Sequence, residues 1–163
     1  MTWLTVGTDA VLGVFALMFA FLWFRFRLRA VLAGAGVVLA YAVSEVVKLL
    51  VREDRPCRTR PSLAECPEVG DWSFPSNHSV IAGAAAMAIW AMHRALGWVA
   101  AVCALAAAAS RVVVGVHYVH DVLAGLTLGA LVSWGIAVLL TRVLPKRRVL
   151  PDDAPTVVMS RLG

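Results

Sequence analysis

A small set of polar side chains stands out in this otherwise apolar chain of 163 residues. They lie at four places: Lys48 with Arg55 and Pro56, then Ser76, Asn77 and His78, then Ser110 and Arg111, and finally His117 with Asp121. Lysine and arginine neutralise the oxygens of a phosphate in transfer reactions, and histidine serves as a nucleophile or a proton donor. These residue types therefore indicate phosphoryl transfer, provided that the fold brings the four places together.

Each of these polar groups has a role in such a site. His117 and Asp121 are four residues apart, so on a helix they share one face and the carboxylate can orient the ring. His117 is then the expected nucleophile, and His78 is the acid that protonates the leaving oxygen. The phosphate itself is expected to be held by cations and by the first turn of a helix whose amides face the anion, namely by Lys48, Arg55, Arg111, Ser76 and Asn77.

The composition predicts the scaffold that carries these residues. The chain is 61% hydrophobic and 15% charged, whereas soluble domains are roughly 45–50% apolar and about 25% charged. The most polar stretch, Val51 to Pro75, is too short to build a core of its own, which excludes a large soluble domain. We therefore predict an all-α, polytopic membrane bundle of about five transmembrane helices. Their expected bounds are Val6 to Phe24, Ala30 to Leu50, Ser76 to Met92, Leu96 to Val114 and Val119 to Leu140.

The distribution of basic residues predicts the orientation of this bundle. One set of turns carries eight lysines and arginines without an acid, whereas residues 51–75 carry four arginines and five acidic residues. By the positive-inside rule, the amino terminus and residues 51–75 lie outside, and the four polar places share the extracytoplasmic face of the plasma membrane. Residues 1–144 form the transmembrane domain, and residues 145–163 are expected to be a disordered cytoplasmic tail. The net charge of +5 then belongs to membrane loops, and we expect no nucleic-acid partner.

The motifs also carry a family resemblance. The chain resembles the type 2 phosphatidic acid phosphatase (PAP2) superfamily, whose motifs are K-x6-R-P, P-S-G-H and S-R-x5-H-x3-D. They correspond here to Lys48 with Arg55-Pro56, to residues 75–78, and to Ser110-Arg111 with His117 and Asp121. The resemblance implies that His117 attacks phosphorus with support from Asp121, and that His78 later activates water against a phosphohistidine without a metal or other cofactor. Two departures are the asparagine at position 77, in place of glycine, and five expected spans instead of six.

The resemblance leads to a function with open alternatives. It implies a membrane lipid phosphatase with a lipid phosphate as substrate and membrane lipids around it. Among such enzymes it favours undecaprenyl (polyprenyl) diphosphate phosphatase, which recycles the cell-wall carrier. The alternatives are a phosphatase for phosphatidate, phosphatidylglycerophosphate or a prenylphosphoryl-sugar phosphate, or a non-catalytic lipid-phosphate binding or transport protein. Binding alone needs only cations, so the presence of both His78 and His117 favours an enzyme. The oligomeric state is left open.

Four further residues are candidates for supporting roles. Glu45 precedes Lys48 by three residues and is either its ion-pair partner or a group that tunes Lys48 or a phosphate proton. Cys57 and Cys66 form a disulfide if their loop faces an oxidising compartment, and are otherwise two thiols. His120 is expected to be structural or interfacial. No cysteine or histidine spacing supplies three or four ligands, so no metal site is expected.

Overall fold

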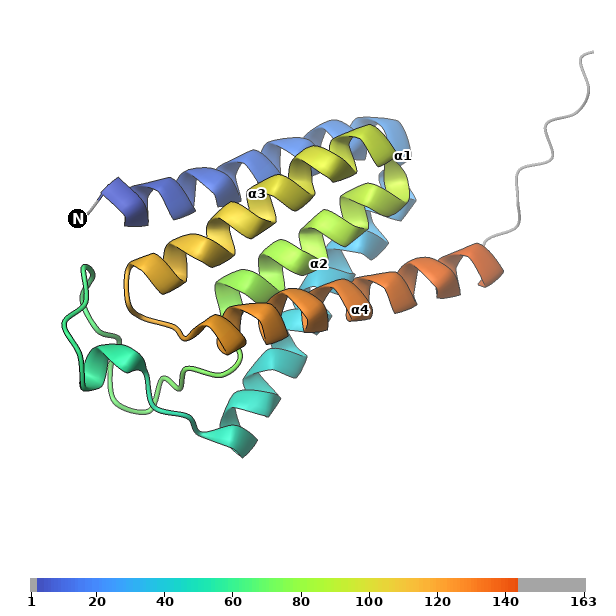
Figure 1. Ribbon diagram of the computed structural model, residues 1–163. Coiled ribbons are helices and arrows are strands. Elements are labelled where there is room, and N and C mark those ends of the chain that lie inside the picture. Colours follow the sequence, from blue (N-terminus) through green and yellow to red (C-terminus); the bar gives the residue numbers. More distant parts are fainter. Residues whose placement is uncertain (1–2, 144–163) are drawn as a thin grey trace, which may run out of the picture.

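The computed structural model describes residues 3–143, and all the regular secondary structure in that range is helical. The elements are α1 (Trp3–Val51), the short 3-10 helix η1 (Pro56–Arg58), α2 (Asn77–Met92), α3 (Arg94–Val113) and α4 (Val119–Val143) (Figure 1). The predicted all-α class is confirmed. The tail predicted over residues 145–163 lies outside the described residues.

Helix α1 differs from the prediction, which placed two separate spans in this region. It contains 49 residues, so a straight helix would be about 73 Å long, against roughly 30 Å for the hydrocarbon layer. The backbone leaves the helical region at Phe26, with φ −139° and ψ 45°, and Figure 1 shows two arms that meet at this bend. The bend lies among Arg25, Arg27 and Arg29, where the apolar sequence is interrupted. The expected break is therefore a single non-helical residue.

Three helical segments are long and apolar enough to cross a membrane. They are Gly13–Val51 within α1, Arg94–Val113 and Val119–Arg142. Large apolar side chains point outward from these segments, for example Leu17 at 73% exposure, Phe24 at 81% and Val102 at 66%, as expected for lipid-facing positions. The number of about five crossings stays a prediction, because the two arms of α1 form one helix and α2 has only 16 residues.

Helix α2 lies at the centre of the bundle, between α3 and α4 in Figure 1. Most of its residues are buried. Phe15 and Leu22 from the first arm of α1 pack with Ile89 of α2 and Ala104 of α3, whereas Ala40 of the second arm packs with the face of α2 that turns towards α4. Packing on every side fixes α2 and, with it, the P-S-N-H segment at its amino-terminal end.

Glycines bring α2 and α4 unusually close. A Cβ added at Gly83 of α2 would overlap the carbonyl oxygen of Leu126, and one added at Gly129 of α4 would overlap that of Val80. At Gly125 the added Cβ would lie 2.7 Å from the carbonyl oxygen of Ser76. Gly125 and Gly129 form a G-x-x-x-G pattern, which favours close helix contact in membranes.

We expect the substitution Gly129→Ala to destabilise the protein by about 1–3 kcal/mol, because overpacking forces two backbones apart. The midpoint of thermal unfolding in detergent measures this loss. The matched control is Gly135→Ala in the same helix, where a Cβ meets nothing within 4 Å and helix propensity favours alanine. Equal midpoints for the two variants would contradict the close α2–α4 contact.

Candidate active site

The polar residues singled out above gather at one end of the bundle, where the loop of residues 52–76 folds over the helix ends (Figure 1). Several of them are almost fully buried in spite of their polarity, namely Lys48, Arg55, Ser76, His117 and Asp121, and so is Ser73 in the loop. Burial of charged groups is costly unless they are paired. These buried charged groups therefore need contacts that pair them.

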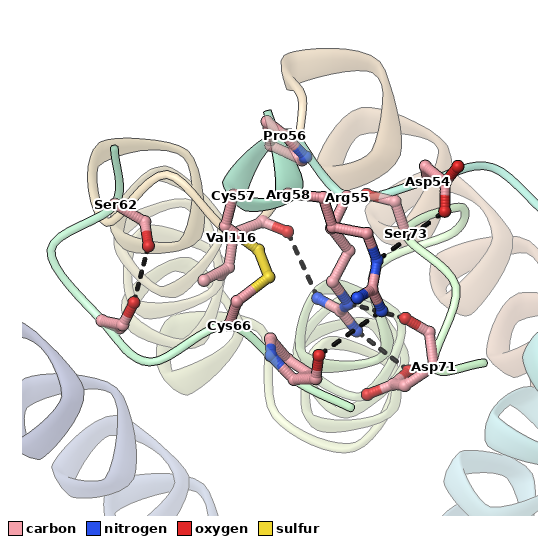
Figure 2. The surroundings of a disulfide bond; sticks show 12 residues. Asp54, Arg55, Pro56, Cys57, Arg58, Ser62, Cys66, Asp71, Ser73 and Val116 are labelled. Carbon is pink, nitrogen blue, oxygen red and sulfur yellow. Dashed lines mark hydrogen bonds and ion pairs between the residues drawn. A yellow bond between two sulfur atoms is a disulfide. The ribbon is translucent and has the colours of Figure 1, made fainter. Parts of the chain in front are cut away.

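Arg55 connects the loop to the segment between α3 and α4. Its Nε donates to the carbonyl oxygen of Asp71 at 2.9 Å, and its Nη2 donates to Oδ1 of the same residue at 3.0 Å. Its Nη1 lies 3.2 Å from the carbonyl oxygen of Val116 and 2.9 Å from Nε2 of His117. Figure 2 shows the guanidinium between Asp71 and Val116. One side chain thus places a positive charge directly beside the imidazole.

The contact with Arg55 determines which nitrogen of His117 carries the proton. Because a guanidinium only donates, Nε2 must accept with its lone pair and therefore carries no proton in the neutral ring. Nδ1 then carries the proton, and it lies 3.3 Å from Oδ2 of Asp121. Burial lowers the pKa of His117 below its usual 6.5, the hydrogen bond to Asp121 opposes this, and the charges of Arg55 and Arg111 lower it further. This lowered pKa favours a ring that is neutral near pH 7, with its proton on Nδ1.

Asp121 is held by several donors at the start of α4. Its Oδ2 accepts from the backbone amide of Tyr118 at 2.8 Å and from the hydroxyl of Ser73. Its Oδ1 lies 3.1 Å from Nε2 of His120. The carboxylate is fully buried, so these contacts fix the orientation of the His117 ring.

The segment at the start of α2 is joined directly to this group. The backbone amide of Ser76 donates to the carbonyl oxygen of Asp121 at 3.2 Å. The prediction that this amide faces an anion is therefore wrong for Ser76, since α4 uses it. The Ser76 hydroxyl, in contrast, is buried without a hydrogen-bond partner among the described residues. His78 is the second residue of α2 and is partly buried.

Two more cations complete the charge distribution. Lys48, at the end of α1, donates from Nζ to Oδ1 of Asp71 at 3.0 Å. Arg111 lies in the last turn of α3, near enough to influence the pKa of His117. The fold therefore brings Arg55 and Arg111 towards one imidazole, and Asp71 joins Lys48 to Arg55, which is an arrangement suited to a phosphate.

Comparison with known proteins agrees with this geometry. Residues 29–145 match the family model described as PAP2 superfamily, which covers most of the chain. The chain belongs to the PAP2 superfamily. Over 126 residues it is 38% identical to decaprenylphosphoryl-5-phosphoribose phosphatase of Mycobacterium tuberculosis, covering 76% of this chain but 65% of that protein.

Two further matches are a second curated relative and a solved structure. The chain is 27% identical to undecaprenyl-diphosphatase BcrC of Bacillus subtilis over 131 residues, covering 78% of this chain and 68% of that protein. The crystal structure of a transmembrane PAP2 type phosphatidylglycerolphosphate phosphatase from Bacillus subtilis has the same fold, with a TM-score of 0.71 and 24% identity. The match covers 89% of this chain and 77% of that one.

Asn77 departs from the PAP2 motif, and the structure shows where its side chain lies. Its Nδ2 donates to Oε1 of Glu45 at 2.6 Å, and its Oδ1 accepts from the hydroxyl of Ser44 at 2.8 Å. The asparagine side chain therefore joins α2 to α1. Asn77 is not among the residues with positive φ, so its substitution for glycine needs no left-handed backbone.

Glu45 has a different main partner from the one predicted. Its Oε1 lies 4.0 Å from Nζ of Lys48, at the limit of an ion pair, whereas the bond to Asn77 is short. Sequence spacing suggested Lys48 as the partner of Glu45, because spacing identifies neighbours only within one helix. The long-range contact to Asn77 needed the packing of α1 against α2.

The loop that covers the PAP2 site is closed by a disulfide. Cys57 and Cys66 are bonded, with their Cα atoms 5.7 Å apart, so the structure takes the paired alternative. Figure 2 shows this bridge beside Arg55 and Val116. Cys103 is a free cysteine in α3. The bridge begins two residues after Arg55 and restricts the loop that carries it.

Several neighbours of the PAP2 motifs escaped the sequence analysis. Ser73 and Asp71 lie in the loop, and His120 was expected to be structural or interfacial. Nε2 of His120 lies 2.8 Å from Oε1 of Glu53, so it joins this loop residue to Asp121. Ligand atoms of Glu53, His120 and Asp121 lie within 4.8 Å of one another and could hold a metal ion. Spacing missed this group because Glu53 is 67 residues from His120.

Proposed function

We propose that this protein is a membrane phosphatase that removes a terminal phosphate from a lipid through a phosphohistidine intermediate. The observation that carries the proposal is the position of His117, whose Nε2 lies 2.9 Å from the guanidinium of Arg55 and whose Nδ1 lies 3.3 Å from Asp121. A nucleophilic lone pair and a phosphate-binding cation thus stand side by side. A protein that only binds anions would need the cation but not the oriented imidazole.

The proposed reaction has two steps, transfer of the phosphate to His117 and hydrolysis of the phosphohistidine. The lipid phosphate enters beside Arg55, Lys48 and Arg111, and Nε2 of His117 attacks phosphorus while the bond to the lipid oxygen breaks. His78 gives its proton to that oxygen and then takes one from a water molecule, which attacks the phosphohistidine. Asp121 stabilises the imidazolium that forms on His117. Inorganic phosphate and the dephosphorylated lipid are the products.

The substrate is proposed by analogy with the relatives. We infer undecaprenyl or another polyprenyl diphosphate as the leading candidate, in line with the undecaprenyl-diphosphatase of Bacillus subtilis. A prenylphosphoryl-sugar phosphate is the second candidate, because the mycobacterial decaprenylphosphoryl-5-phosphoribose phosphatase is 38% identical to this chain. The Cys57–Cys66 bridge supports a site on the oxidising, extracytoplasmic face of the plasma membrane.

Phosphate release from purified protein in detergent tests this proposal. The panel contains undecaprenyl diphosphate, a prenylphosphoryl-sugar phosphate, phosphatidate and phosphatidylglycerophosphate, each with and without EDTA. We expect turnover of at least one prenyl substrate that EDTA does not change. Loss of activity in EDTA would contradict the metal-independent reaction, and phosphate binding without any turnover would indicate the binding or transport alternative.

The pH profile of kcat/KM should carry the signature of His117. Below its pKa the ring is protonated at both nitrogens and cannot attack, so activity falls as the pH falls. Because the pKa of His117 is lowered, we expect the midpoint of the acid limb to lie below 6.5. Arg111→Gln should move this midpoint upward, since the charge of Arg111 helps to lower that pKa. An acid limb above 6.5 in the unmodified protein would contradict the assignment.

A further inference from the structure

Asp71 forms ion pairs with Lys48 and Arg55, two of the cations that bind phosphate in the proposed function. Its Oδ1 lies 3.0 Å from Nζ of Lys48 and 3.0 Å from Nη2 of Arg55. The two cations are about 6% and 5% exposed, whereas the Asp71 side chain is 46% exposed. An accessible carboxylate on the loop thus reaches inward to two buried positive charges.

The chemistry of this contact resembles that of a bound phosphate. A carboxylate and a phosphate both offer anionic oxygens to the same donors, and arginine forks fit either. Partial burial raises the pKa of Asp71, but hydrogen bonds from Lys48 and Arg55 outweigh it and hold that pKa below 3.8. Asp71 is therefore charged throughout the neutral range, and a ligand must displace an anion.

The loop allows this displacement without unfolding. Gly70 has φ +99°, a conformation that favours glycine, and the amide of Asp71 donates to the carbonyl oxygen of Glu68 at 3.2 Å. The carbonyl oxygen of Asp71 is held separately by Nε of Arg55 at 2.9 Å. The backbone of Asp71 therefore has its own anchors, and rotation of the side chain alone would release Lys48 and one edge of the guanidinium.

We propose that Asp71 is an internal competitor for phosphate, which occupies Lys48 and Arg55 in the resting site and yields to an incoming phosphate ligand. The inference rests on the proposed function. A tethered competitor lowers the affinity for every such ligand by one common factor, because each must displace the same carboxylate. Weakly bound monoanionic headgroups, which are abundant at a membrane surface, then fail to occupy the site. After hydrolysis the same carboxylate returns to the cations and expels inorganic phosphate.

Binding of two small probes to the purified protein in detergent tests this inference. Orthophosphate represents a terminal phosphate and dimethyl phosphate represents a diester headgroup. We expect Asp71→Asn to tighten the binding of both probes by the same factor, about ten-fold or more. Asp71→Ser makes the same loss of charge without an amide that could itself bond to Arg55, and it serves if the asparagine variant does not fold.

The matched control is Glu68→Gln, which removes one negative charge from the exposed surface of the same loop and leaves the contacts of Lys48 and Arg55 in place. It should change both affinities less than two-fold. Unchanged or weaker binding in the folded Asp71 variants would overturn the inference while leaving the phosphatase proposal intact. Failure of the unmodified protein and of the Asp71 variants to bind orthophosphate would overturn both.

Discussion

Replacement of His117 by alanine should reduce phosphate release from the preferred lipid by about 10³-fold or more, because the reaction loses its nucleophile. The substitution leaves Lys48, Arg55 and Arg111 in place. The variant should therefore still bind orthophosphate within a few-fold of the unmodified protein. Turnover and binding, measured on the same preparation in detergent, separate loss of chemistry from loss of the phosphate site.

A second readout identifies the covalent step. Substrate labelled in its terminal phosphate should leave label on the unmodified protein after an alkaline quench, because phosphohistidine survives base, and acid should remove it. The His117→Ala protein should carry none. His93→Asn is the matched control, since His93 lies at the opposite end of α2 and caps α3 by accepting from the amide of Leu96, a role that asparagine can fill. Full activity of His117→Ala would overturn the nucleophile assignment.

The substitution Asp121→Asn should lower kcat by about 10²–10⁴-fold. The asparagine is nearly the same size and can still accept from the amide of Tyr118. It cannot stabilise an imidazolium, and its amide group favours the tautomer of His117 that has its proton on Nε2. That proton would point towards Nη1 of Arg55, which lies 2.9 Å away and can only donate. We therefore expect impaired attack in a protein that remains folded.

Glu53→Gln is the control for this experiment. Glu53 contacts Nε2 of His120, the nitrogen that also lies near Oδ1 of Asp121, so its replacement removes a nearby charge and leaves the contact between Asp121 and His117 in place. We expect kcat within a few-fold of the unmodified value. The thermal midpoint of each variant reports on folding, and a folded Asp121→Asn protein with normal kcat would show that the carboxylate does not orient the nucleophile.

The sequence located the site because its motifs lie at helix ends. The helices α2, α3 and α4 begin or end within a few residues of the predicted spans, since long apolar runs and polar interruptions constrain such boundaries strongly. The contact between His117 and Asp121 was also predicted from their four-residue separation, and it forms at 3.3 Å although His117 precedes α4 and is not part of the helix. These are local relations, and local relations can be read from spacing.

The parts that escaped prediction are contacts between distant segments. Asn77 was expected to face phosphate through its amide at the start of α2, and spacing did not show that its side chain bonds to Glu45 at a separation of 32 residues. Asp71 gave no periodic signal, because it lies in a loop whose course depends on Arg55 and on a disulfide. The bend at Phe26 was missed for a different reason, since hydropathy marks where an apolar run stops but not whether the helix continues through it.

The glycine contacts between α2 and α4 have a consequence for how the site is kept in register. Ser76 and Asp121 meet at 3.2 Å through backbone atoms, and Gly125 lies one turn from that meeting point with no side chain to hold the helices apart. The relative position of Ser76 and Asp121 thus depends on the absence of a side chain at Gly125 as well as on the hydrogen bond between them. Because a larger residue on either helix moves the nucleophile and the phosphate cradle relative to each other, selection should restrict side-chain volume at positions that never touch a substrate.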